Sequence, residues 1–253
     1  MRLKPIRNIC FLIIIIFFVT ACEKDNMFNM RTFDAPEAIY NFPDDKLWKH
    51  RVNTASEAVE AFKSFNGVEL DVFYISELNQ FQTGHDYPSG INLEDYLDSI
   101  ANCNTFYYWI DFKNLNAGNV HLSVEKLKQI LAKYELFNKV IVENSNPDLL
   151  AFFKFTGIYT SLWIKDVSET FITSYAENEL YEDLEVILSK YQFNAVSAHY
   201  NMVSFMGQYL RKYNCHIWTN GLITESDKQK IKFYASKRNI KVILVDYNDN
   251  FMK

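Results

Sequence analysis

Eight short apolar segments, separated by stretches with helical periodicity, limit the possible folds of this chain more than any other feature. The segments are rich in β-branched and aromatic residues and have the length of buried strands. They cover residues 47–50, 68–74, 106–112, 139–143, 159–164, 194–199, 215–219 and 241–247. Buried strands that alternate with helices are typical of a parallel sheet with helices packed against it.

The stretches between these segments carry apolar residues every three or four positions, which predicts amphipathic helices. We expect helices after Asn92 and after Ser123, both suited to N-cap positions, over residues 180–191, and from about Thr224. Eight strands alternating with helices predict an α/β fold of the (β/α)8 type, a TIM barrel, without a large insertion. A doubly wound open sheet is the alternative, but no glycine-rich phosphate loop follows any strand.

The N-terminus has the features of an export signal. Three basic residues within positions 1–7 precede an apolar run too short to span a bilayer comfortably, and small residues follow it. The ending "VTAC" resembles a bacterial lipoprotein box and predicts a signal peptide over 1–22 with a lipidated Cys22. An uncleaved anchor is the alternative. Residues 23–44 are then a tether and 45–253 the barrel, held at the cell envelope, with the bacterial outer membrane as the expected site.

Charge and cysteine content narrow the range of partners. Removal of residues 1–21, which contain three basic and no acidic residues, changes the net charge from −5 to −8. Nucleic-acid binding through bulk charge is therefore not expected, and membrane attachment would come from acyl chains on Cys22. Cys103 and Cys215 remain for a disulfide, although two free thiols are favoured, and their spacing matches no metal motif.

Acidic residues interrupt two neighbouring strands of the predicted barrel. Glu69 and Asp71 alternate with aliphatic residues, so both carboxylates lie on one face of their strand. Asp111 and Lys113 repeat this spacing at the end of the next strand. Because reactive groups gather at the carboxyl ends of barrel strands, we expect the three acids to converge. Oxygen ligands of this kind suit a hard divalent cation, Mg²⁺ or Ca²⁺.

Two histidines and one tryptophan fall near the same end of the barrel. His50 closes the first strand, His85 follows the second in a loop, and Trp218 lies at the end of the seventh. Two histidines beside a metal predict an acid–base pair, and Lys113 would help to hold an anion, most naturally a phosphodiester. Trp218 is expected to form a wall that faces the substrate. Weaker candidates for ligand contact are Glu143, His199 and His216.

The segments "KHRVNT", "VELDVFY", "GHD", "WIDFK", "IWTN" and "VILVDY" follow one another in order. Together they resemble the motifs of the glycerophosphodiester phosphodiesterase family over residues 45–250. The resemblance implies a metal-dependent phosphodiesterase on a TIM barrel. It implies metal ligands at Glu69, Asp71 and Asp111, a catalytic pair at His50 and His85, and phosphate contacts from Arg51 and Lys113.

Three departures from the family pattern concern the substrate. Where the family has His-Arg-Gly, this chain has Val52 in place of the glycine, and the glutamate that follows in the family is missing. The third acid is Asp111, where the family usually has Glu. No insertion follows the second strand. In these respects the sequence is closer to the sphingomyelinase D branch. We expect cleavage of glycerophosphodiesters or phospholipid headgroups. The alternatives are a non-catalytic barrel lipoprotein that binds a lipid, glycan or protein, and a metal-independent phospholipase C.

Overall fold

The computed structural model describes residues 40, 42–165, 174–222 and 224–253. The predicted signal peptide and Cys22 lie outside the described residues, as does most of the predicted tether. Within the described part of the chain, no helix is long and apolar enough to cross a membrane.

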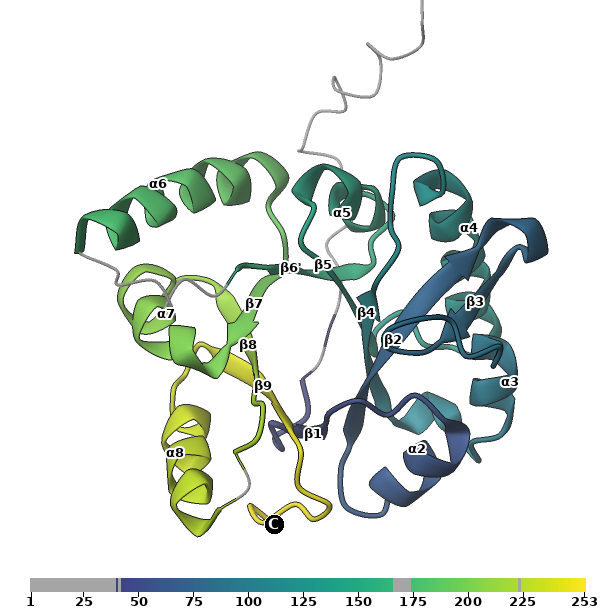
Figure 1. Ribbon diagram of the computed structural model, residues 1–253, viewed down its shortest axis with the longest axis horizontal. Coiled ribbons are helices and arrows are strands. Elements are labelled where there is room, and N and C mark those ends of the chain that lie inside the picture. The colour runs from purple at the N-terminus through teal and green to yellow at the C-terminus, as the bar shows by residue number, and fades with distance from the viewer. Residues whose placement is uncertain (1–39, 41, 166–173, 223) are drawn as a thin grey trace, which may run out of the picture. The chain divides into compact units, whose positions relative to one another are not determined.

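Eight parallel strands form a closed barrel, which confirms the predicted fold (Figure 1). Each of the eight predicted segments is one of these strands. β1 pairs with β9 on one side and with β2 on the other, and this double pairing closes the ring. The strands are β1 (Leu47–Lys49), β2 (Gly67–Ile75), β4 (Tyr107–Phe112), β5 (Val140–Asn144), β6 (Tyr159–Trp163), β7 (Ala195–His199), β8 (Asn214–Trp218) and β9 (Ile240–Val245).

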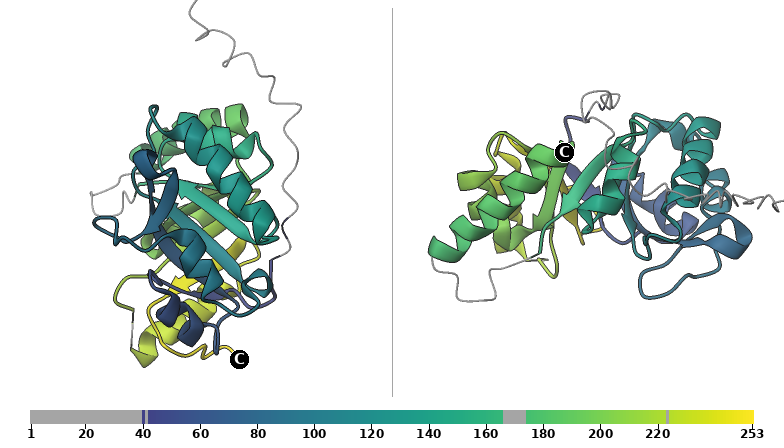
Figure 2. Two further views of the ribbon diagram at one scale, coloured as in Figure 1. Left: turned by 90° about the vertical axis from the view of Figure 1, so that its right-hand side faces the viewer. Right: turned by 90° about the horizontal axis from the view of Figure 1, so that it is seen from above.

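Helices lie outside the ring of strands (Figure 1, Figure 2). They are α2 (Ala55–Ala61), α3 (Leu93–Asp98), α4 (Val120–Lys133), α5 (Pro147–Lys154), α6 (Ser174–Tyr191), α7 (Val203–Tyr209) and α8 (Glu225–Ala235). Asn92 and Thr224 cap α3 and α8 as expected. The predicted cap at Ser123 is wrong, because α4 begins one turn earlier and the Ser123 hydroxyl donates to the Val120 carbonyl inside the helix.

A short hairpin strand, β3 (Gln80–Thr83), is the main addition to the predicted barrel. It pairs antiparallel with the second half of β2. Between β2 and β4 the chain forms only β3, α3 and two single 3₁₀ turns, so the predicted absence of a large insertion is confirmed. The hairpin returns the chain to the mouth of the barrel, where the loop with His85 begins.

The core has an outer and an inner part. The outer part fills the space between strands and helices, while Trp48, Trp109 and Tyr159 belong to a separate cluster made of residues of the barrel strands. Tyr40 and Phe42, at the end of the predicted tether, pack on Tyr159 near the amino ends of the strands. The packed barrel domain therefore includes residues from at least position 40. Cys103 and Cys215 are free thiols, as the sequence favoured.

Candidate active site

A cavity of about 310 Å³ opens at the carboxyl ends of the barrel strands. It is the expected position for a reactive site in this fold. All eight predicted site residues line the cavity: His50, Arg51, Glu69, Asp71, His85, Asp111, Lys113 and Trp218.

Three carboxylates form one side of the cavity, which we call the acidic wall (Glu69, Asp71 and Asp111). Asp71 on β2 and Asp111 on β4 are partners in the strand register, and Glu69 lies two residues before Asp71 on the same face. One oxygen atom from each carboxylate lies within 4.8 Å of the other two. Glu69 and Asp71 are almost completely buried. The predicted convergence of the three acids is therefore present.

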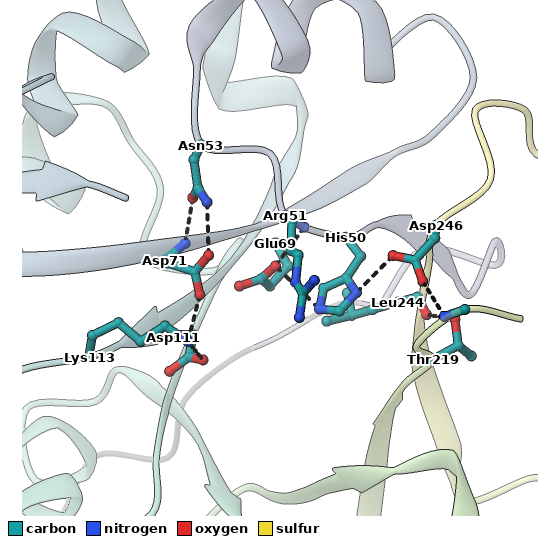
Figure 3. A network of polar contacts seen from close by, with 11 residues as sticks. His50, Arg51, Asn53, Glu69, Asp71, Asp111, Lys113, Thr219, Leu244 and Asp246 are labelled. Atoms are coloured by element: carbon teal, nitrogen blue, oxygen red, sulfur yellow. Dashed lines mark hydrogen bonds and ion pairs between the residues drawn. The ribbon is translucent and has the colours of Figure 1, made fainter. Parts of the chain in front are cut away.

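The "HRVNT" segment holds two of these acids in place (Figure 3). Arg51 has a left-handed backbone conformation, with φ of 57°, and its amide donates to Glu69 Oε2 at 2.7 Å. The Asn53 side chain bonds Asp71 twice: Nδ2 donates to Asp71 Oδ2, and Oδ1 accepts from the Asp71 amide, each at 2.8 Å. Val52, at the position of the family's glycine, is buried in the core. The altered segment thus still builds an ordered site.

Lys113 supplies the positive charge within the acidic wall. Its Nζ lies 2.7 Å from Asp71 Oδ1 and 2.6 Å from Asp111 Oδ2. Burial acts to lower the pKa of the Lys113 ammonium, but Asp111 and Asp71 outweigh it and raise that pKa above its ordinary value. Lys113 therefore stays charged, and it offsets one of the three acids.

Lys113 alone does not balance the three carboxylates of the acidic wall. Burial, and then the charges of Asp71 and Asp111, raise the pKa of the Glu69 carboxyl well above its ordinary value. Burial also raises the pKa of Asp111, against the opposing effect of Lys113. Nearby positive charge favours ionised carboxylates, and hard divalent cations prefer oxygen ligands. The acidic wall therefore has the donor set and the charge deficit that a divalent cation would satisfy.

His50 is oriented by a carboxylate from the other end of the chain. Its Nδ1 lies 3.1 Å from Asp246 Oδ1, while Nε2 lies 3.8 Å from Glu69 Oε2. Burial acts to raise the pKa of Asp246, but the hydrogen bond and charge of His50 and the Gly221 amide outweigh it and lower that pKa. With Asp246 accepting from Nδ1, the Nε2 atom of His50 is directed toward the acidic wall.

His85 lies in the loop after β3, and a glycine shapes this loop. Gly84 has φ of 142°, and a Cβ there would lie 2.2 Å from the Tyr87 carbonyl oxygen. The Gly84 amide donates to the Asp71 carbonyl, which ties the loop to β2. His85 Nδ1 lies 2.7 Å from Asp86 Oδ1, and the imidazole is 44% exposed. Both histidines thus pair with a carboxylate through Nδ1.

Two tryptophans form the opposite side of the cavity, which we call the aromatic wall (Trp163 and Trp218). Their ring centroids are 6.1 Å apart at an interplanar angle of 50°. Trp163 ends β6 and is 38% exposed, whereas Trp218 ends β8 and is half-buried. Glu143 of β5 also lines the cavity and is 6% exposed. Trp218, which was predicted to face the substrate, lies at the surface of the cavity.

Several site residues were not selected from the sequence. In the sequence, Asn53 and Asp246 occur only within the quoted motifs, and Trp163 is one residue of a predicted strand. Asn53 could have been predicted from the sequence, because it lies in the "KHRVNT" segment, which is one of the segments that resemble the family motifs. The weaker candidate His216 points into the barrel interior, where burial lowers its pKa to about 3, and it does not line the cavity.

Comparisons with known proteins agree with this picture at the level of the fold. No protein-family model matches the chain, and no curated protein sequence matches it. Solved structures do match. A glycerophosphodiester phosphodiesterase from Parabacteroides distasonis is similar with a TM-score of 0.58 and 13% identity, over 81% of this chain and 94% of that one.

Two further structures extend the comparison. An Oleispira antarctica phosphodiesterase, in complex with the product sn-glycerol-3-phosphate, gives a TM-score of 0.59 at 14% identity, over 82% and 94% of the two chains. A calcium-dependent phosphoinositol-specific phospholipase C from Pseudomonas gives 0.51 at 11% identity, over 82% and 91%. This chain therefore has the barrel fold of the glycerophosphodiester phosphodiesterases, the family that its motifs resemble.

Proposed function

We propose that this chain is a phosphoric diester hydrolase that uses a divalent cation and cleaves glycerophosphodiesters or phospholipid headgroups. One observation carries the proposal. Two histidines, each paired with a carboxylate through Nδ1, line the same cavity as three converging acids and a lysine. Acid–base groups beside a site for a hard cation are the equipment that phosphodiester cleavage requires.

The acidic wall would hold the cation, Mg²⁺ or Ca²⁺, which when bound polarises a phosphoryl oxygen and offsets negative charge. Lys113 and Arg51, which line the same cavity, would bind the other phosphoryl oxygens. One of His50 and His85 removes a proton from the attacking oxygen. The bond from phosphorus to the leaving alcohol breaks as the other histidine protonates that oxygen. Attack by water gives a phosphomonoester, and attack by a neighbouring substrate hydroxyl gives a cyclic diester.

Two similar structures support this choice of substrate class. The Oleispira antarctica protein was solved with sn-glycerol-3-phosphate as its product, and the Pseudomonas protein is a calcium-dependent phospholipase C. A metal-independent mechanism is disfavoured here, because it would give no reason for three acids, two of them buried, to converge.

The test is an assay of the purified full-length chain after treatment with a chelator. Glycerophosphodiesters, lysophospholipids and sphingomyelin are each supplied with Mg²⁺, with Ca²⁺ or without metal. We expect turnover that depends on added metal. Clear metal binding without turnover of any substrate would favour the alternative, a barrel that binds a lipid, glycan or protein without cleaving it.

We also propose that the protein is an envelope lipoprotein attached through acyl chains on Cys22, with the bacterial outer membrane as its site. The support is the "VTAC" motif after a basic and then apolar segment. Mass spectrometry of the mature protein tests this directly. An unmodified Cys22 in the mature chain would refute it.

A further inference from the structure

A groove of about 1020 Å³ lies at the opposite end of the barrel from the active-site cavity. It is lined by the last turns of α7 and α8, which are neighbours outside the barrel (Figure 1), and by the loops that lead from these helices into β8 and β9. Loops that precede the strands of such a barrel lie at the amino ends of the strands, whereas the reactive site lies at the carboxyl ends. The groove and the cavity share no lining residue.

Five basic side chains line this groove, which we call the basic groove (Arg211, Lys212, Lys237, Arg238 and Lys241). None of the described aspartates and glutamates lines it. The chain as a whole has a net charge of −5, so the excess of positive charge is local. Clustered cations repel one another, and an anion between them would relieve the repulsion.

Most of these cations have no ionic partner in the protein. Lys212 is the exception, with its Nζ 2.5 Å from Glu185 Oε1. Among the described carboxylates, none forms an ion pair with the other four residues of the basic groove. Burial, and then the charge of Lys241, lower the pKa of Lys46 just before β1, so the positive charge acts beyond the groove itself.

Helix dipoles account for only part of this arrangement. Cations are favoured near the last turn of a helix, and Arg211 follows α7 in this way, with its Nε donating to the Gly207 carbonyl. Lys237 is placed similarly after α8. Arg238 and Lys241 lie beyond the last turn, in the next loop and on β9, where the dipole effect has fallen off. Their presence therefore needs another reason.

An exposed phenylalanine gives the basic groove an apolar edge. Phe233 of α8 is 56% exposed and lines the groove. The Lys237 Nζ lies 3.9 Å from the centroid of its ring. Basic side chains beside an exposed aromatic ring are typical of surfaces that bind a bilayer, because the ring enters the interface while the cations meet phosphate groups. A soluble anion would use the cations but not the ring.

The polypeptide enters the barrel at the same end. Phe42 lies among the amino ends of the strands, and its ring centroid is 5.5 Å from that of His216 on β8. The residues that precede it in the sequence include the apolar run and Cys22, the proposed attachment to a membrane. A bilayer that holds the N-terminal segment is therefore joined by the chain to the end of the barrel that carries the basic groove.

We propose that the basic groove binds the phosphate groups of an anionic lipid bilayer, with Phe233 at the interface. The amino ends of the strands then face the bilayer, and the active-site cavity opens away from it. This inference rests on the proposed envelope location. Together with the proposed function, on which this consequence rests, it means that the substrates are soluble glycerophosphodiesters and not lipids of the bilayer to which the protein is bound.

Tryptophan quenching tests the orientation. The full-length protein is reconstituted in vesicles of brominated phosphatidylcholine, with or without phosphatidylglycerol, because bromine on acyl chains quenches only nearby indoles. Phe233→Trp adds an indole at the groove, whereas the four native tryptophans lie inside the barrel or at the cavity. We expect phosphatidylglycerol to raise the quenching of the added indole about threefold or more. Native fluorescence should not respond to phosphatidylglycerol.

Removal of charge tests the groove itself. In the Phe233→Trp background, the pair Arg211→Gln and Arg238→Gln should abolish most of the added quenching, because each basic side chain near an anionic surface contributes about fivefold to binding. Salt at about 0.5 M should have the same effect. The matched control is the pair Lys128→Gln and Lys230→Gln, two lysines outside the groove on α4 and α8, and it should change nothing.

Three results would overturn the inference. One is equal quenching of the added indole with and without phosphatidylglycerol, and another is full quenching in the Arg211→Gln, Arg238→Gln pair. The third is quenching of the native tryptophans by anionic vesicles, which would place the cavity at the bilayer. Heparin serves as a soluble polyanion, and binding of heparin without any response to phosphatidylglycerol would reassign the groove to such a partner.

The activity test separates this inference from the proposed function. With metal added, protein in phosphatidylglycerol vesicles should cleave added soluble glycerophosphodiesters and leave the phosphatidylglycerol of the same vesicles intact. The Arg211→Gln, Arg238→Gln pair should keep kcat for the soluble diester. Cleavage of the bilayer lipid by the protein bound to it overturns the orientation and leaves the proposed function standing. Quenching as expected, without turnover of any diester, supports the orientation and contradicts the proposed function.

Discussion

The acidic wall and the aromatic wall differ in how their polar groups are held. Asp71 is bound by Asn53 and Lys113, and Glu69 is bound by the Arg51 amide. On the other side, the Glu143 Oε2 atom has no partner among the described residues, and Trp163 is open to solvent. Groups held by several hydrogen bonds suit a part of the site where charge develops during reaction, because they need little rearrangement there. Exposed aromatic rings and an unpaired carboxylate suit the recognition of a ligand.

The largest expected effect comes from the histidine beside the acidic wall. His50→Ala should lower kcat by about 10²–10⁴-fold, because it removes a proton-transfer group. The cation affinity should change little, because His50 is not part of the acid cluster. Steady-state kinetics with calorimetry of metal binding measure both. His121→Ala, on the exposed surface of α4, is the control, and full activity in His50→Ala would contradict the assigned role.

The next effect tests whether the acidic wall is a metal site. Asp71→Asn removes one negative charge from the cluster and should weaken metal binding by about 10–100-fold or more. Asn53→Ala leaves the ligands present but removes the two hydrogen bonds that orient Asp71, and a loss of about tenfold is expected. Calorimetric titration with Mg²⁺ and Ca²⁺ gives both values. If neither variant differs from Glu125→Gln, a surface control on α4, the acids do not bind the metal.

Glu143 should make the protein less stable as pH rises. Burial, and then the charge of Asp111, raise the pKa of Glu143 well above its ordinary value. The unfolded chain, with a glutamate pKa of about 4.3, loses its proton first, so ionisation above that pH favours unfolding. Glu143→Gln should therefore stabilise the metal-free protein by about 1–3 kcal/mol at pH 7. This gain should vanish near pH 4, and chemical denaturation at both pH values measures it. A Gln variant less stable than wild type at pH 7 would show that Glu143 has a partner.

Asp246 should have the opposite and smaller effect. Its pKa is lowered in the folded protein, so its contribution to stability is present above the unfolded pKa of about 4 and is lost as pH falls further. Asp246→Asn should cost about 1 kcal/mol at pH 7 and almost nothing at pH 3. The two acids thus give difference curves of opposite sign in the same denaturation experiment. Curves of the same sign would contradict the opposite pKa shifts of Glu143 and Asp246.

The sequence predicted the strands and the acidic wall because both depend on local patterns. A buried strand of a parallel barrel is a short apolar run, and acids spaced two apart lie on one face wherever the strand is placed. The short β3 and α2 lack such patterns over enough residues. The Ser123 cap was wrong because a serine inside a helix can bond its own preceding turn instead of capping a new one.

The pairing of His50 with Asp246 and the exposure of Trp163 could not be predicted in the same way. His50 and Asp246 are 196 positions apart, and their contact exists only because the first strand lies beside the last. In the sequence Trp163 is one more apolar residue of a strand. Only the closed barrel shows that its indole lies at the mouth of the barrel and lines the cavity. Such features depend on closure of the barrel and have no local signature.

The joining of β1 to β9 also has a consequence for biogenesis. A growing polypeptide makes His50 early and Asp246 almost last, and until β9 forms, β1 lacks one of its two neighbours. A nascent chain therefore contains all three acids of the acidic wall before His50 has its partner Asp246. The contact between His50 and Asp246 can form only after the last strand has been made, so a chain with this arrangement completes the cavity only when nearly all of it has been synthesised.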